Sequence, residues 1–203
     1  DNRLIVEHYA AMKKYLNYLT SRADNHIIAY GLGDWFDIGP KRPGYAQLTS
    51  NGLTATAIYY YDTMLLREMA SLLGEKEDEM YFAALAGKIK KAYNDTFFHP
   101  GTMTYDRNSQ TASAMSLYMD LVAPENKAKV SDNLVKDIQE RNNALTAGDI
   151  GYRYVLRTLE SGGLSELIFD MNSKYDVPGY GWQLAHGATA LTESWQAYGF
   201  VSN

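Results

Sequence analysis

The feature that most constrains this chain is the spacing of its apolar residues, which follows the repeat of an α-helix along most of the sequence. Residues 78–95, for example, place Phe82, Leu85, Ile89 and Tyr93 on one face and charged residues on the others. No convincing stretch alternates strictly between apolar and polar residues, so a β-sheet is not expected to organise the fold. The spacing therefore predicts an all-α protein.

Two kinds of helix are expected to alternate. Residues 125–141 carry apolar Val130, Leu134 and Ile138 on one face, as a half-exposed helix does. Residues 111–122 are apolar nearly all round, which is typical of a helix buried on every side. The other expected helices cover residues 3–19, residues 53–73 with Gly74 as a favourable C-cap, and the charge-poor segments 150–159 and 188–198.

This alternation is typical of a helical toroid, in which successive helical hairpins build an inner ring inside an outer ring. An open helical solenoid would show a similar rhythm. A closed ring is favoured because the unusual residues gather in the loops that enter the expected inner helices, and rim loops of a ring converge on one pocket. These residues are Asp34, Trp35, Tyr105, Asp106, Asp149 and those from 180 to 186.

Composition excludes several classes of function. The 203 residues contain no cysteine, so thiol nucleophiles, disulfides and zinc–thiolate sites are absent. The net charge is −5 and no basic stripe offsets it, which argues against a nucleic-acid partner. No apolar run approaches the roughly 18 residues that a membrane span needs, so membrane insertion is not expected. A soluble single domain, residues 1–203, is expected.

One carboxylate side chain stands alone near the end of the chain. Glu193 is the only acidic residue between Val177 and Asn203, and its neighbours are small or aromatic. If these neighbours exclude water from it, the carboxylate becomes a better proton acceptor and could act as a general base. The alternative is a structural one, in which Glu193 caps a helix or pairs with an arginine such as Arg153. Spacing alone favours neither interpretation.

The loop near the start combines acids with an indole ring. Asp34 and Asp37 flank Trp35, and such a group can bind a sugar through hydroxyl–carboxylate hydrogen bonds and ring stacking, or can simply cap a helix and pack a loop. The three spaced ligands of a calcium loop are missing. His99 and His186 lack partners at metal-ligand spacing, so we expect no metal and no cofactor.

The segment from Pro178 to Trp195 resembles glycoside hydrolase family 78, the α-L-rhamnosidases. In that family a Gly-Ala-Thr run precedes a Trp-Glu-x-Trp element; here residues 187–189 match the run, while Glu193 and Trp195 match the end of the element. Thr192 stands where the family usually has an aromatic residue, and Tyr180 stands where it commonly has tryptophan.

Further segments resemble the family in the same order along the chain. Residues 33–35 are similar to its Gly-Asp-Trp loop, and residues 110–112 to the Gln-Thr-Ala start of one of its helices. Residues 145–151 resemble its threonine–glycine loop, although Tyr152 replaces the threonine that often follows. The resemblance therefore covers almost the whole chain.

The resemblance implies an (α/α)6 barrel that removes terminal α-L-rhamnose from glycosides with inversion. The implied partner is a rhamnose-containing glycoside or polysaccharide. Glu193 would be the general base, and the general acid would lie upstream of the first helix of this chain. The compartment stays open between the bacterial cytoplasm and the periplasm or secretion. The residues expected to hold the sugar are Asp34, Trp35, Tyr180, Trp182, His186 and Trp195.

The family pattern also predicts that these residues are a C-terminal-side part of the catalytic domain, with about four of its six hairpins, and inactive alone. One alternative is another helical-toroid glycosidase or polysaccharide lyase. The other is a non-catalytic helical scaffold in which Glu193 only binds carbohydrate.

Overall fold

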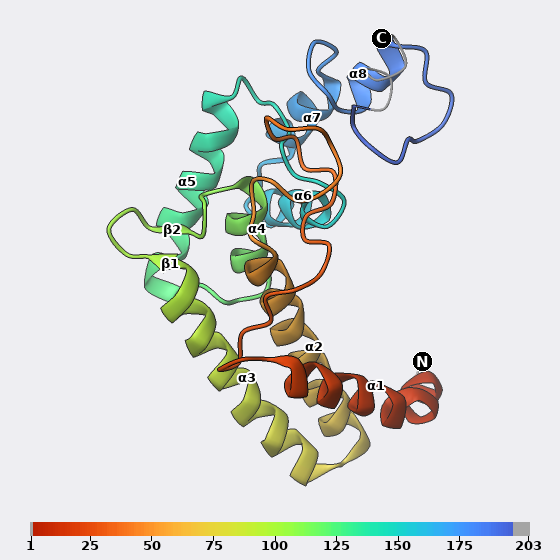
Figure 1. Cartoon of the computed structure of the whole chain (residues 1–203), viewed down its shortest axis with the longest axis vertical. Coiled ribbons are helices and arrows are strands. Elements are labelled where there is room, and N and C mark those ends of the chain that lie inside the picture. The colour runs from red at the N-terminus through yellow and green to blue at the C-terminus, as the bar shows by residue number, and fades with distance from the viewer. Residues whose placement is uncertain (1, 197–203) are drawn as a thin grey trace.

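The computed structural model describes residues 2–196, and this part of the chain is helical apart from one short hairpin and the connecting loops (Figure 1). The expected all-α class is confirmed. None of the described helices is both long and apolar enough to cross a membrane. The elements are α1 (Asn2–Arg22), α2 (Asn51–Leu73), α3 (Lys76–Phe97), β1 (Phe98–His99), β2 (Thr104–Tyr105), α4 (Gln110–Tyr118), the 3-10 turn η1 (Pro124–Asn126), α5 (Lys127–Glu140), α6 (Gly151–Ser161), α7 (Ser165–Ser173) and α8 (Tyr180–Ala185).

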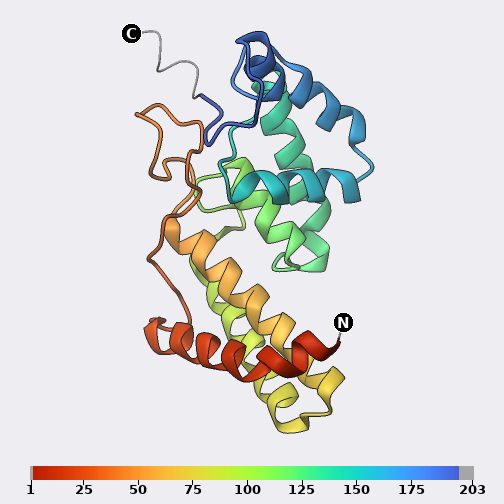
Figure 2. The ribbon, with the colours of Figure 1, turned by 90° about the vertical axis from the view of Figure 1, so that its right-hand side faces the viewer.

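The helices pair into hairpins in the inner–outer order that the sequence predicts. Helix α3 packs on α2, α5 on α4 and α7 on α6, while α4 also contacts both α2 and α6 (Figures 1 and 2). In α4 every residue from Gln110 to Ser116 is buried, as expected for an inner helix. These three hairpins, with α1 before them and the short α8 after them, form an incomplete helical toroid.

Local sequence accounts for the ends and faces of these helices. Ser50 caps α2, since its side chain accepts a hydrogen bond from the backbone N–H of Leu53. Gly74 ends α2 in the left-handed conformation, with φ of 78°, which confirms the predicted C-cap. The apolar faces predicted for α3 and α5 are the buried faces of those helices.

The expectation of an inner helix over residues 188–198 is wrong for the part that the structure describes. Residues 188–196 form turns and bends, and residues 197 and 198 lie outside the described residues. Gly187, with φ of 85°, ends the preceding turn, and Leu191 is 78% exposed. Most helices in proteins are stabilised by packing rather than by propensity, and in this segment residues 189–191 and 193 are exposed, while Trp195 packs against α6 and α8.

The only regular strands in the described residues, β1 and β2, have two residues each and pair as an antiparallel hairpin just before α4. Tyr105 donates a hydrogen bond of 2.6 Å to the side-chain oxygen of Asn94 on α3, and its ring packs against Phe98 and Tyr93. The hairpin thus fixes the loop that carries Asp106 toward the neighbouring helix starts.

Candidate active site

The N-termini of the inner helices α2, α4 and α6 meet at one end of the molecule. The carboxylate of Asp106, just before α4, accepts a 2.7 Å hydrogen bond from the backbone N–H of Ser50, the N-cap of α2. The hydroxyl groups of Thr49 and Ser109 are 2.6 Å apart. The long loop of residues 23–50 leaves the end of α1 and runs to this same end of the molecule, where residues 187–196 also lie (Figures 1 and 2). The predicted convergence of entry loops is therefore present.

Asp34 is buried below the loops at this end of the molecule and is not exposed at their surface. Its side chain is completely buried, and its carboxylate accepts hydrogen bonds from the Thr111 hydroxyl (2.5 Å) and from the backbone N–H groups of Gly148 (3.0 Å) and Gly151 (2.7 Å). Burial raises the pKa of Asp34, and these three hydrogen bonds oppose that rise. Ile150, the N-cap residue of α6, has no side-chain cap of its own, so Asp34 supplies the missing acceptor.

Asp37 fixes the same loop in a similar way. Its carboxylate accepts hydrogen bonds from the backbone N–H groups of Gln47 (2.9 Å) and Leu48 (2.6 Å). Burial raises the pKa of Asp37, and these hydrogen bonds lower it. Within residues 2–196, no three acidic or histidine side chains are grouped so that they could hold a metal ion.

Two glycines allow the loop before α6 to lie directly against the Trp35 loop. A Cβ atom at Gly148 would stand 2.2 Å from the carbonyl oxygen of Trp35, and one at Gly151 would stand 1.9 Å from the hydroxyl of Thr111. This close approach lets the backbone N–H of Asp149 donate a 2.8 Å hydrogen bond to the carbonyl of Trp35. The two loops therefore form one locked unit.

Trp35 forms part of a largely apolar cleft of about 460 Å³ at the rim. Its half-buried indole is held by edge contacts with Phe36 (5.4 Å between ring centroids) and Tyr45 (5.2 Å). Phe36 has φ of 59°, a backbone conformation that is unusual for a bulky residue. The other side of the cleft includes Asp149 and Ile150.

A second pocket, of about 320 Å³, carries an aromatic wall. The rings of Tyr152, Tyr180 and Trp195 meet edge to face, with centroids 4.8 to 5.9 Å apart. The indole N–H of Trp195 donates a 3.0 Å hydrogen bond to the carbonyl of Ala147, in the loop before α6. Glu193 and Asp149 also line this pocket.

Glu193 is exposed and faces this pocket. The condition that small and aromatic neighbours exclude water from the carboxylate is not met by the described residues, because residues 188–196 are not helical and Glu193 is exposed. Within residues 2–196, no hydrogen-bond donor or cation is bonded to its carboxylate. The alternative of a structural ion pair with Arg153 is therefore not what the described residues form.

Asp149 is the functional candidate to which sequence reasoning gave no role. It lines both the Trp35 cleft and the Glu193 pocket, so it stands where the two meet. The pKa of Asp149 is raised by burial first and then by the negative charge of Glu193, which places the two carboxylates in the same electrostatic neighbourhood. Its position in the rim loop was visible in the sequence, but its proximity to Glu193 was not.

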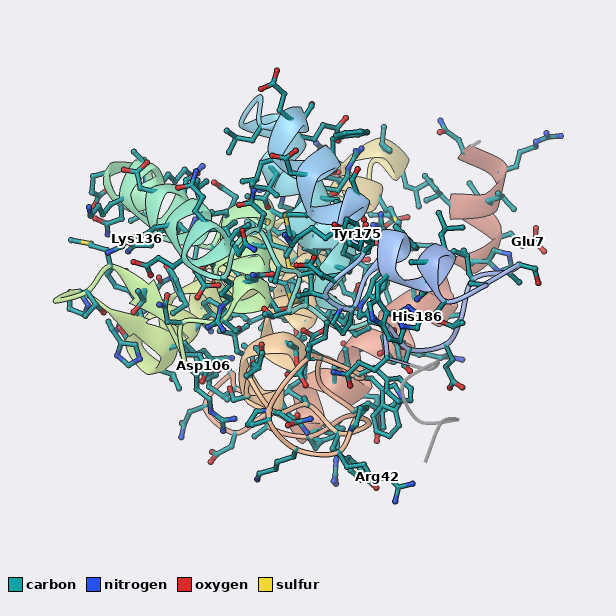
Figure 3. The ribbon with its side chains drawn as sticks, turned by 90° about the horizontal axis from the view of Figure 1, so that it is seen from above. Glu7, Arg42, Asp106, Lys136, Tyr175 and His186 are labelled. Atoms are coloured by element: carbon teal, nitrogen blue, oxygen red, sulfur yellow. The ribbon has the colours of Figure 1, made fainter. Side chains whose placement is uncertain are left out.

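Trp182 and His186 are not among the residues that line these two pockets. The ring of Trp182 on α8 lies against that of His186, the C-cap residue, with centroids 4.0 Å apart, and a ring nitrogen of His186 is 2.8 Å from the carbonyl oxygen of Trp182. Figure 3, which looks down on this end, labels His186 at the C-terminal end of α8 and Arg42 on the long loop. The structure thus brings together Trp35, Tyr180, Glu193 and Trp195, with Asp34 beneath them, and leaves Trp182 and His186 to one side.

The protein family of this helical chain follows from its match to a known family model. The model of the bacterial alpha-L-rhamnosidase 6 hairpin glycosidase domain matches residues 1–201. The chain belongs to this family. The resemblance read from the motifs is confirmed, and the alternation of inner and outer helices is that of the six-hairpin glycosidase domain.

Relatives of this six-hairpin domain are named α-L-rhamnosidases. One from Formosa agariphila is 27% identical over 199 residues, which cover 98% of this chain and 22% of the relative. One from Alteromonas sp. is 26% identical, again over 98% of this chain and 22% of the relative. The chain thus spans about a fifth of the length of these relatives.

Solved structures agree with the fold. An α-L-rhamnosidase from Dictyoglumus thermophilum superposes with a TM-score of 0.88 at 33% identity, covering 96% of this chain and 22% of that one. The Streptomyces avermitilis α-L-rhamnosidase, solved as a complex with L-rhamnose, superposes with a TM-score of 0.86 at 23% identity, covering 97% of this chain and 18% of that one.

Proposed function

We propose that these 203 residues are the C-terminal-side part of the catalytic domain of a longer, inverting glycoside hydrolase that removes terminal α-L-rhamnose. The proposal is supported by the family, by the names of the relatives and by the share of their length, about a fifth, that this chain spans. The single observation that carries it is that Glu193 lines a pocket walled by aromatic rings and has a carboxylate with no bonded partner in the described part of the chain.

The proposed role of Glu193 is that of the general base. Its carboxylate takes a proton from a water molecule, and the water oxygen forms a bond to the anomeric carbon of the sugar on the face opposite the leaving group. The glycosidic C–O bond breaks, and the leaving oxygen receives a proton from a general acid that we place upstream of α1. In an inverting enzyme the two carboxyl groups stand about 6.5–9.5 Å apart, which leaves room for the water.

The aromatic wall is proposed to hold the sugar. Tyr180 and Trp195 offer flat apolar faces with polar edges, which suit the mixed surface of a deoxyhexose, and Trp35 offers the same in the adjoining cleft. We assign Asp34 a supporting role beneath the cleft, because its carboxylate is buried and already bonded. Trp182 and His186 would contact only a substrate that extends beyond the pocket.

The test is Glu193→Gln in the longer protein. The amide keeps the size of the carboxylate but cannot accept the proton of water, so turnover of an aryl α-L-rhamnoside is expected to fall by about 10³-fold or more, while L-rhamnose still binds. Glu166→Gln, which changes an exposed acid on α7, serves as the matched control. Full turnover by the Glu193→Gln variant would reject the role, and would favour a protein in which Glu193 only binds.

Two further measurements fix the reaction class. Inversion predicts that β-L-rhamnose is the first product released, which proton NMR of a fresh reaction can observe before the anomers equilibrate. A panel of aryl rhamnoside, glucoside and uronide substrates separates the proposed activity from that of another helical-toroid glycosidase or lyase.

A further inference from the structure

We propose that Asp149 is a substrate-contacting residue, which accepts hydrogen bonds from sugar hydroxyl groups where the Trp35 cleft meets the Glu193 pocket and thereby sets specificity for the hydroxyl pattern. This inference rests on the proposed glycosidase function and adds a residue to it.

The backbone holds Asp149 in one place. Its N–H is bonded to the carbonyl of Trp35, and two glycines that flank it, Gly148 and Gly151, donate their own N–H groups to the buried carboxylate of Asp34. The loop that carries Asp34 and Trp35, 114 positions before Gly148 in the sequence, therefore holds this turn on both sides of Asp149. A side chain on a turn that is anchored in this way is presented in a constant position, which is what recognition of a rigid sugar requires.

The chemistry of the pocket favours a ligand that brings hydrogen-bond donors. Three donors of the lining are used inside the protein: the Tyr152 hydroxyl binds Asn172 at 2.5 Å, the Thr192 hydroxyl binds the carbonyl of Ser194 at 2.7 Å, and the Trp195 indole binds Ala147. Tyr180 and Gln183 also line the pocket and could contact the same ligand. The two carboxylates, by contrast, have no donor bonded to them among residues 2–196. A polyhydroxylated ring supplies donors for both.

Electrostatics separates the roles of the two acids. Partial burial and the neighbouring charge of Glu193 both raise the pKa of Asp149, so its ionised form lacks stabilisation from the protein. Hydroxyl donors from a bound sugar would provide that stabilisation. Because no third ligand stands near the two acids within the described residues, a metal ion is not the expected occupant. Glu193 then remains available for the water.

The test uses Asp149→Ala and Asp149→Asn in the longer protein, with a series of monodeoxy aryl α-L-rhamnosides. Asp149→Ala is expected to lower kcat/KM for the intact sugar by about 10- to 100-fold, the loss that follows removal of a hydrogen bond to a charged group. For the deoxy sugar that lacks the contacted hydroxyl, the same substitution should change kcat/KM less than about twofold. Asp149→Asn should lie between the two, since it keeps a neutral acceptor.

The controls separate this role from the alternatives. Asp132→Ala, which removes an exposed acid on α5, should leave all substrates unchanged. An equal loss on every deoxy sugar, or no loss on the intact one, would overturn the inference. A loss that grows with the pKa of the leaving group would also overturn it, because it would make Asp149 the general acid. If the unsubstituted protein turns over no rhamnoside at all, the proposed function fails instead, and the two failures are distinguishable.

Discussion

The carboxylate of Asp34 accepts a 2.7 Å hydrogen bond from the backbone N–H of Gly151, although the two residues are 117 positions apart. The bond joins the Trp35 loop to the first residue of α6, and the second carboxylate oxygen holds Thr111 at the start of α4. A single buried acid thus ties two inner helices to the loop that walls the cleft. These hydrogen bonds support the pocket, and we expect their loss to lower both the stability and the activity of the protein.

Asp34→Asn is expected to destabilise the protein by about 1–3 kcal/mol. The amide NH2 group would have to face an N–H or O–H donor from which the carboxylate oxygen accepts a hydrogen bond in the parent protein. Asp34→Ala should cost more, since it leaves the N–H groups of Gly148 and Gly151 without an acceptor. Thermal unfolding followed by circular dichroism measures both. An unchanged midpoint for the alanine variant would refute the role, with the exposed Asp132→Asn as the control.

Gly148→Ala is expected to cost about 3 kcal/mol or more and to abolish activity, because the new Cβ would overlap the carbonyl oxygen of Trp35 and push the two loops apart. The matched control is Gly87→Ala in the middle of α3, where a Cβ meets nothing within 4 Å and the backbone is helical. That variant should instead be stabilised by about 0.5–1 kcal/mol. Chemical denaturation of the pair decides the matter: equal effects at the two positions would contradict the close approach.

The stability of the protein should depend on pH through Asp62 on α2. Burial raises the pKa of Asp62 to about 6, above its ordinary value of 3.8. Because the unfolded chain releases this proton first, the contribution of Asp62 to stability is fully present below about pH 4 and is lost as the pH rises to about 6.

Asp62→Asn removes this dependence. The difference in thermal midpoint between the variant and the parent protein should grow in favour of the variant from about pH 4 to about pH 6, and stay constant at higher pH. A difference that does not change across this range would show that Asp62 ionises as freely in the folded chain as in the unfolded one.

Trp195→Phe is expected to lower kcat/KM about 2- to 10-fold in the longer protein, because phenylalanine keeps an aromatic ring but loses the hydrogen bond to Ala147 that anchors the segment carrying Glu193. Steady-state kinetics on an aryl rhamnoside provides the measurement. Tyr175→Phe, which changes an exposed ring between α7 and α8, is the control. The anchoring role is wrong if both variants retain full activity.

The 203-residue chain by itself is expected to release no aryl group from a rhamnoside, because we place the general acid outside it. The same assay on the longer protein provides the reference. Detectable turnover by the isolated chain would place a working acid within these residues and would direct attention to Asp149.

Much of the fold was predictable because helix periodicity and caps are local properties. The buried faces of α3 and α5, the end of α2 at Gly74 and the all-round burial of α4 follow from which side chains stand three or four positions apart. The same reasoning failed for residues 188–196, because low charge does not by itself make a helix: Trp195 packs against α6 and α8, but residues 189–191 and 193 are exposed.

The sequence by itself determined the helical class, the inner–outer order, the family and the candidacy of Glu193, since each depends on residue types at short, fixed spacings. Only the tertiary structure decided that Asp34 is buried under the cleft, that Trp182 and His186 stand apart from the pocket, and that Asp149 shares it with Glu193. The reason is physical. Whether a carboxylate is buried and hydrogen-bonded or lines a pocket depends on residues from helices that are distant in the sequence, and the local spacing of residues around the carboxylate does not specify those contacts.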